Sequence, residues 1–201
     1  MTDFTRDLKW FFSHDNAWGV LWRLVVLSFT IFAPTGYYLD ICRRATKFGP
    51  NEVDLPDPFE KFTDYWLEGL KLACISFVFC LPLIAIIIFC AWKNIPFVGN
   101  IAQLIILPVT PMLYIYFTVK SEQDSLFDIG KMISIASEDL GWFIGWVFLW
   151  CIWNGIGSMG ILLLLFGVMF TSQYAMVSYC YALGSNIYGK KDYFKQMGFF
   201  N

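Results

Sequence analysis

Charged side chains are the first shortage of this sequence: Asp, Glu, Lys and Arg make up 15% of its 201 residues. Soluble domains carry about 25% charged residues and about 45–50% apolar ones. Here the apolar share is 58%. These two departures predict that lipid surrounds much of the chain. The formal net charge of −2 argues against a nucleic-acid-binding protein, because such proteins need a basic surface.

Histidine is nearly absent, since His14 is the single one in the chain. Ser-His-Asp catalysis and H-E-x-x-H metal chemistry both need partners that this sequence lacks. His14 also lies in the N-terminal segment, away from any long apolar run that could bring a haem ligand to membrane depth. We therefore expect a solvated histidine, no enzymatic activity and no cofactor.

Clustered cysteines are also missing, because the six cysteines are scattered and form no C-x-x-C pair. A disulfide framework belongs to short secreted chains, and iron–sulfur or zinc sites need grouped thiolates. The start of the chain carries acids in place of a basic leader region, so we expect no signal peptide. The cysteines are expected to be small buried apolar residues.

Acidic residues gather only between positions 54 and 68, where carboxylates could hold Mg²⁺ or Ca²⁺. Their spacing fits no EF-hand, and a solvated acidic loop is the favoured interpretation, with no metal. The residues are Asp54, Asp57, Glu60, Asp64 and Glu68.

Long uncharged runs are what the sequence has instead. Residues 72–92 contain no charge, and about 20 apolar residues are enough to cross a bilayer as a helix. Residues 96–118, 141–156 and 161–187 are also predicted to be transmembrane helices. The predicted fold is all-α and integral to the membrane, with residues 1–201 forming a single domain.

Amphipathic stretches separate these runs. Residues 1–17, 59–71 and 121–140 place apolar side chains on one side and are predicted to be helices on the membrane surface. Residues 190–201 form a tail.

The stretch 18–44 decides the predicted topology, because it is apolar but interrupted by Pro34 and Gly36. If it enters the membrane and returns as a hairpin, twelve Lys and Arg residues lie inside and only Lys93 lies outside. If it spans, ten lie inside and three outside. Basic residues mark the cytoplasmic side, so the re-entrant hairpin is favoured over a spanning helix. The expected location is the inner (cytoplasmic) membrane, with both termini in the cytoplasm.

Basic residues near this stretch have two interpretations each. Arg43, Arg44 and Lys47 could bind anionic lipid headgroups, although simple anchoring on the cytoplasmic side is favoured. Arg23 lies early in the apolar stretch, where a charge must snorkel or pair. Snorkelling to the interface is favoured. The alternative is a functional or acid-paired role, for which Asp15 and Asp40 are the candidate partners.

Uncharged polar residues at membrane depth could line a cavity beneath the hairpin. The favoured alternative is hydrogen bonding between helices. The candidates, with Arg23, are Asn100, Gln103, Asn154 and Gln173.

Tryptophan recurs along residues 142–153. Gly141, just before this run, and Gly145 within it form a G-x-x-x-G pair. Large rigid rings suit contact with neighbouring proteins. We expect lateral packing through Trp142, Trp146, Trp150 and Trp153.

Three segments carry a family resemblance. They are Gly36-Tyr-Tyr-Leu-Asp-Ile-Cys-Arg-Arg44, Trp66-Leu-Glu-Gly69-Leu-Lys-Leu72, and Phe170-Thr-Ser-Gln-Tyr-Ala-Met-Val177 with the following residues to Tyr188. With these segments the chain resembles the bacterial and archaeal integral membrane proteins grouped as domain of unknown function 4013. The resemblance implies a multi-helix membrane fold and supplies no activity. Gln173 departs from the smaller or aromatic residue expected there.

Two functions remain open from the sequence. The first is a non-catalytic accessory or scaffold subunit that packs against membrane lipids and other membrane subunits or a second copy of itself. The alternative is a small transporter or lipid-handling protein that uses a polar cavity beneath the hairpin.

Overall fold

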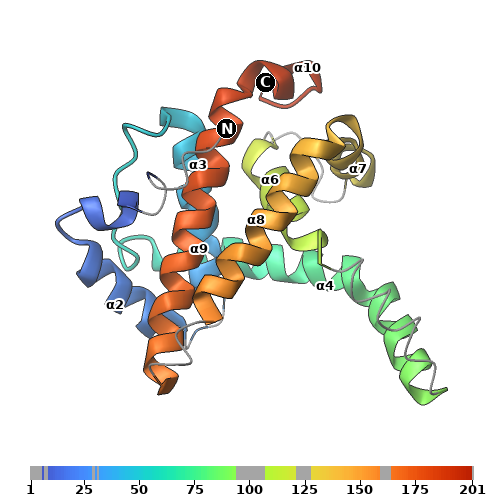
Figure 1. Ribbon diagram of the computed structural model, residues 1–201, viewed down its shortest axis with the longest axis horizontal. Helices are drawn as coiled ribbons and strands as arrows, with labels where there is room; N and C mark the ends of the chain where they lie inside the picture. Colours follow the sequence, from blue (N-terminus) through green and yellow to red (C-terminus); the bar gives the residue numbers. More distant parts are fainter. Residues whose placement is uncertain are drawn as a thin grey trace.

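A computed structural model describes residue 6 and residues 9–28, 30, 32–93, 107–120, 128–158 and 164–200. Regular structure in these residues is helical throughout (Figure 1), which confirms the all-α prediction for this part of the chain. The elements are η1 (Phe11–Ser13), α2 (Ala17–Ser28), α3 (Ala33–Phe48), α4 (Phe62–Trp92), α6 (Val109–Val119), α7 (Ile129–Glu138), α8 (Leu140–Ser158), α9 (Leu164–Gly189) and α10 (Lys191–Gln196).

Helix α3 lies at the centre and packs against α4 on one side and α9 on the other. Glycine makes both contacts close. A Cβ atom on Gly36 would lie 1.9 Å from the backbone oxygen of Tyr65, and one on Gly69 would lie 1.9 Å from that of Phe32. Across α9, a Cβ on Gly184 would lie 2.2 Å from the oxygen of Cys42. The backbones of α3, α4 and α9 therefore meet almost directly.

Residues 18–44 follow a path that returns along α9. Contacts with α9 mark this path: Trp10 stacks on Tyr181 with ring centroids 3.9 Å apart, Trp22 meets Phe170 at 4.6 Å, and a Cβ on Gly49 would lie 3.1 Å from the Tyr188 ring. The chain thus descends from the level of residue 181 to that of residue 170 and climbs back to residue 188. Helix α2 has 12 residues, or about 18 Å, which is too short for a hydrocarbon core of about 30 Å.

Helix α4 joins two elements that the sequence analysis separates. The predicted surface helix 59–71 and the predicted span 72–92 form one helix of 31 residues. Pro82 lies inside it. No proline or glycine lies at the boundary between Lys71 and Leu72. The helical backbone hydrogen bonds therefore continue there, although the side-chain pattern changes from amphipathic to apolar. The second half of α4 extends away from the other helices (Figure 1).

Two helices of the described part, α4 and α8, are long and apolar enough to cross a membrane. Only 11% of the most apolar window of α4 and 22% of that of α8 is buried, so most of each helix is left uncovered by the described residues. Helix α9, predicted as a span, differs: its second half is enclosed by protein, with Tyr179, Cys180 and Leu183 fully buried. Two of the four predicted spans are thus clear candidates in the described residues, and the full set of four stays a prediction.

The remaining predicted elements are seen in part. Of the predicted span 96–118, the structure describes 107–118, which contain most of α6. Helices α7 and α10 lie within the predicted surface helix 121–140 and the tail 190–201. Both lie at the end of the molecule where α9 finishes (Figure 1).

Candidate functional site

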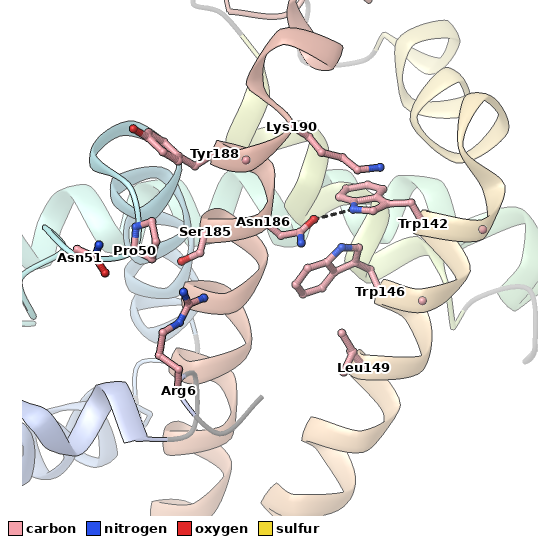
Figure 2. Close-up of a pocket in the computed structure, with 13 residues that line it drawn as sticks. Arg6, Pro50, Asn51, Trp142, Trp146, Leu149, Ser185, Asn186, Tyr188 and Lys190 are labelled. Atoms are coloured by element: carbon pink, nitrogen blue, oxygen red, sulfur yellow. Dashed lines mark hydrogen bonds between the residues drawn. The ribbon is translucent and has the colours of Figure 1, made fainter. Parts of the chain in front are cut away.

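A cleft of about 710 Å³ lies between the first half of α8 and the end of α9. Figure 2 shows its two sides: tryptophan rings project from α8, and polar groups project from α9, the N-terminal segment and the loop at residues 50–51. The lining residues include Arg6, Asn51, Trp142, Trp146, Ser185 and Lys190. This volume is within the range of about 300–1,000 Å³ typical of small-molecule sites.

The α8 side of the cleft is fixed by the cap that starts the helix. An oxygen of Asp139 accepts a hydrogen bond from the backbone N–H of Trp142 at 3.0 Å, which satisfies a donor that the helix cannot satisfy itself. The indole Nε1 of Trp142 donates to Oδ1 of Asn186 at 2.7 Å (Figure 2). Gly141 and Gly145 leave room beside these rings, because a Cβ on Gly145 would meet no atom within 4 Å.

The rim of the cleft is held by an ion pair between the starts of α8 and α10. Lys190 Nζ lies 2.6 Å from Oδ2 of Asp139 and 5.0 Å from the centre of the Trp142 ring. The hydrogen bonds from Lys190 and from the Trp142 backbone lower the pKa of Asp139. The carboxylate therefore stays ionised at neutral pH and links the two helices.

Ser185 supplies an unused polar group at the base of the cleft. The residue is 8% exposed, and its hydroxyl oxygen has no hydrogen-bond partner among the described residues. Figure 2 places it on the same side of α9 as Arg6. Burying a hydroxyl without a partner is costly, and the oxygen of Ser185 is itself buried beneath the cleft surface.

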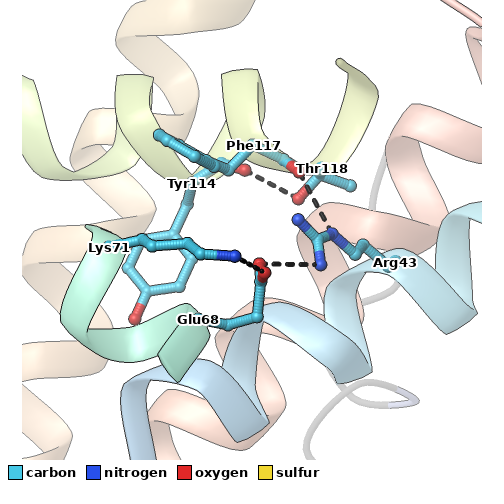
Figure 3. A network of polar contacts seen from close by, with 6 residues as sticks. All are labelled: Arg43, Glu68, Lys71, Tyr114, Phe117 and Thr118. Carbon is cyan, nitrogen blue, oxygen red and sulfur yellow. Dashed lines mark hydrogen bonds and ion pairs between the residues drawn. The ribbon is translucent and has the colours of Figure 1, made fainter. Parts of the chain in front are cut away.

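The two arginines of the predicted headgroup site have partners inside the chain, and lipid binding there stays a prediction. Arg43 lies 3.1 Å from Glu68 and donates to the backbone oxygen of Phe117 at 3.1 Å (Figure 3). Glu68 also pairs with Lys71 at 3.0 Å. This network ties α3 to α4 and to the last turn of α6, where a cation satisfies a free carbonyl.

Arg44 and Lys47 are the other two residues of the predicted headgroup site. Arg44 donates to Asp40 at 2.7 Å, and Asp40 also accepts from the hydroxyl of Tyr65 at 3.2 Å. Lys47 lies 5.2 Å from the ring centre of Phe48. Arg43 thus joins α3 to α4 and α6, while Arg44 pairs with Asp40 of its own helix.

Arg23 is paired, but neither predicted partner provides the carboxylate. It forms an ion pair with Asp57 in the loop before α4, and both side chains are partly exposed. Asp15 and Asp40 were the predicted partners. The ion pair places the loop beside α2. The loop also contacts α3, because the hydroxyl of Tyr37 donates to the backbone oxygen of Pro56 at 3.1 Å.

Gln173 joins three helices. Its amide nitrogen donates to Ser28 of α2 at 2.6 Å, and its oxygen accepts from the hydroxyl of Tyr38 of α3. With 8% exposure, Gln173 holds the two arms of the returning stretch against α9. This matches the favoured hydrogen-bonding interpretation and not an open cavity.

Three other residues, Asn154, Asn100 and Gln103, were candidates for lining the cavity. Asn154 lines a small cleft of about 100 Å³ between α8 and α9, while its amide donates to the Trp150 backbone of its own helix at 2.8 Å. Asn100 and Gln103 lie outside the described residues.

The predicted lateral packing surface of α8 faces largely inward, which corrects that prediction. Trp146 is 3% and Trp153 1% exposed. Trp146 and Trp150 both pack on Tyr179 of α9, with centroids 5.8 and 5.0 Å apart. Gly141 and Gly145 border the cleft and bring no helix close. The helical period alone gave the spacing of these residues but not the direction in which they face.

The residues that the sequence analysis missed are Arg6, Ser185, Asn186 and Lys190. Trp142 and Asn186 are 44 positions apart, and no local pattern links them. The polar character of α9 near its end was the available signal.

Metal ligation finds no support in the described part of the chain, where no three His, Cys, Asp or Glu residues gather closely enough. Two members of the acidic stretch are instead paired with basic side chains, Asp57 with Arg23 and Glu68 with Arg43 and Lys71.

Comparisons with protein-family models, with curated proteins and with solved structures find no match. The resemblance to domain of unknown function 4013 therefore stays a prediction.

Proposed function

We propose that the protein is a non-catalytic integral membrane protein of the inner (cytoplasmic) membrane, and that it acts as an accessory or scaffold subunit by packing α4 against a helix of another membrane protein. The observation that carries this proposal is an exposed stripe along α4 from Cys74 to its end. Its members follow one another by four, three, four, three and four positions. They are Cys74, Val78, Leu81, Ala85, Ile88 and Trp92, all exposed.

This spacing is that of a helix–helix contact. Apolar residues that alternate by three and four positions form one narrow face, which a partner helix can cover with interlocking side chains. Small residues such as Cys74 and Ala85 let helix backbones approach in lipid, where packing rather than the hydrophobic effect drives association. We call these six residues the α4 stripe.

Water is an unfavourable surrounding for this surface. Exposed apolar area costs about 25 cal/mol per Å², and large apolar patches mark protein or membrane contacts. The outer faces of α2 and α8 are similarly apolar, with Trp18, Trp22, Ile144 and Phe148 more than half exposed. These faces suit acyl chains, while the regular spacing of the α4 stripe suits a helix.

Photo-crosslinking in native membranes tests the proposal. A photoreactive phenylalanine analogue at Leu81 or Ile88 should give a discrete adduct with another polypeptide, while the same analogue at Phe148 on the lipid-facing side of α8 should react with lipid only. Adducts of twice the chain mass would identify a second copy as the partner. Lipid adducts alone at all three positions would contradict the proposal.

A lipid-handling function is the second candidate. The cleft between α8 and α9 favours it, at a different place from the cavity that the sequence analysis expected beneath the hairpin. The surroundings of Gln173 are closed by hydrogen bonds, so any ligand site is better sought in the cleft.

A further inference from the structure

We propose that His14 is a proton-sensitive switch between the N-terminal segment of residues 10–14 and the loop of residues 49–54. As an imidazolium it joins the segment to the loop, and as a neutral imidazole it lets the loop separate. This inference goes beyond the proposed function and does not depend on the α4 stripe. It rests on the position of the two ring nitrogens, each of which faces a backbone carbonyl oxygen.

Both partners of the imidazole ring are acceptors. Nδ1 of His14 lies 3.0 Å from the backbone oxygen of Trp10, and Nε2 lies 3.2 Å from that of Val53. A carbonyl oxygen cannot donate, so each contact is a hydrogen bond only when the ring nitrogen carries a proton. A neutral imidazole has one such proton and an imidazolium has two. With both contacts formed, this geometry is that of the protonated ring.

Loss of one proton acts on the contact with the loop. In either neutral tautomer, one ring nitrogen of His14 presents a lone pair to a carbonyl oxygen, and the two repel. The contact with Trp10 spans four positions within one turn of backbone, whereas Val53 is 39 positions away in the chain. The ring therefore relieves the repulsion by turning or moving away from Val53. His14 is partly exposed, so the proton passes to water.

The contact between His14 and Val53 closes a ring of interactions around a hollow of about 460 Å³. Trp10 stacks on Tyr181 of α9 with ring centroids 3.9 Å apart, and the hydroxyl of Tyr181 donates to the backbone oxygen of Pro50 at 2.6 Å. The loop is thus held to α9 at Pro50 and to the N-terminal segment at Val53. Loss of the second attachment frees the part of the loop that follows Pro50.

This loop also borders the cleft between α8 and α9. Arg6, Pro50 and Asn51 line both the hollow and the cleft. A movement of the loop therefore changes the wall that the two share. The protonation of His14 is in this way connected to the shape of the cleft.

Charged neighbours of the imidazole are of both signs. Asp54 lines the hollow and favours the imidazolium, as does Asp15, which follows His14 in the chain. Arg6 and Lys9 line the hollow and oppose it. The titratable group from α9 is Tyr181, whose hydroxyl donates to the loop. With two acids and two bases nearby, the carbonyl contacts determine which form of the ring the closed arrangement prefers.

The direction of the pH effect follows from the extra proton of the closed arrangement. Histidine side chains change charge between about pH 5 and 8. The arrangement that binds the proton is favoured below this range and loses its advantage as pH rises through it. His14 is the single histidine of the chain, so its titration can be followed without interference.

Selective labelling of a buried loop position tests the switch. Val53→Cys provides a thiol at a position that is 4% exposed, and Glu52→Cys is the matched control at the exposed neighbouring position. Each purified variant in mild detergent is treated with a water-soluble maleimide, and peptide mass spectrometry measures labelling at that position alone. The ratio of the two labelling rates cancels the effect of pH on thiol reactivity. Nitrogen-15 spectra of protein labelled in histidine give the pH at which the ring loses its proton.

The ratio of the rate at position 53 to that at position 52 should rise by about tenfold between pH 5.5 and pH 8, as expected for loss of a hydrogen bond to a charged group. The rise should follow the loss of the ring proton. In a His14→Gln background the ratio should not change with pH, because an amide does not titrate in this range. Thermal unfolding verifies that each variant is folded.

Three outcomes would overturn the inference. A constant ratio in the parent background would show that the loop does not open when the proton is lost. A rise of equal size in the His14→Gln background would assign the pH effect to another group. A rise at a pH different from that of the ring titration would do the same, and this comparison needs only the parent background if His14→Gln does not fold. None of these results bears on crosslinking at the α4 stripe, so the two proposals fail separately.

Discussion

Single glycines set the closest approaches in this protein. Gly36 of α3 faces the backbone of Tyr65, and Gly69 of α4 faces that of Phe32. Each helix therefore contributes one glycine against which the backbone of the other packs. Backbone cannot move aside as a flexible side chain can. Even one methyl group at such a position must therefore separate the helices.

Gly36→Ala is expected to destabilise the protein by about 1–3 kcal/mol. The added Cβ would lie 1.9 Å from the oxygen of Tyr65, and α4 must shift to accept it. Gly19→Ala is the control, since nothing lies within 4 Å of an added Cβ there. It should stabilise α2 by up to about 1 kcal/mol. Denaturant unfolding in mild detergent measures both, and equal stabilities for the two variants would show that α3 and α4 do not meet as described.

At the scale of elements, side chains that connect helix ends hold the bundle together. Arg43 reaches the last turn of α6 while pairing with Glu68 of α4. Asp139 caps α8 and pairs with Lys190 at the end of α9. Such contacts join segments far apart in the chain and set how the helices enclose the cleft.

Asp139 makes the rim of the cleft sensitive to acid. Its pKa is lowered in the folded protein by Lys190 and the Trp142 backbone, so its contribution to stability is present above its ordinary value of about 3.9 and is lost as pH falls through the lowered value. Asp139→Asn keeps a good cap but removes the charge. Thermal unfolding from pH 6 downward should show a smaller loss of stability below about pH 4 in the variant than in the parent. Parallel profiles would contradict a role for the ion pair.

At the scale of the whole molecule, several helix ends lie together where α9 finishes (Figure 1). The N-terminal segment lies on α9 through Trp10 and Tyr181, and α7 and α10 lie at the same end (Figure 1). Lys131 of α7 and Phe199, which follows α10, are in contact there, with Nζ 5.5 Å from the ring centre. Lys93 ends α4 away from this group.

Labelling in intact cells tests the orientation that this arrangement favours. In a cysteine-free background, Lys93→Cys should react with a membrane-impermeant maleimide added outside, whereas Ser13→Cys and Lys195→Cys should react only after the cells are opened. The reason is that Lys and Arg accumulate on the cytoplasmic side. Outside labelling of Ser13→Cys with protection of Lys195→Cys would restore a spanning helix at residues 18–44.

The sequence by itself determined the helical class, the apolar character of α4 and α8, and the importance of residues 18–44, because composition and apolar periodicity are local properties. The sequence predicted an interruption at Pro34 and Gly36, but α2 ends at Ser28 and both residues lie inside α3, Pro34 in its first turn. Only the tertiary structure showed that Gly36 serves a backbone contact with α4. Tertiary packing also decided that the α8 tryptophans face α9, that Arg23 pairs with Asp57, and that Gln173 joins α2, α3 and α9. Each of these depends on partners distant in the chain, whose positions are fixed only when the helices pack.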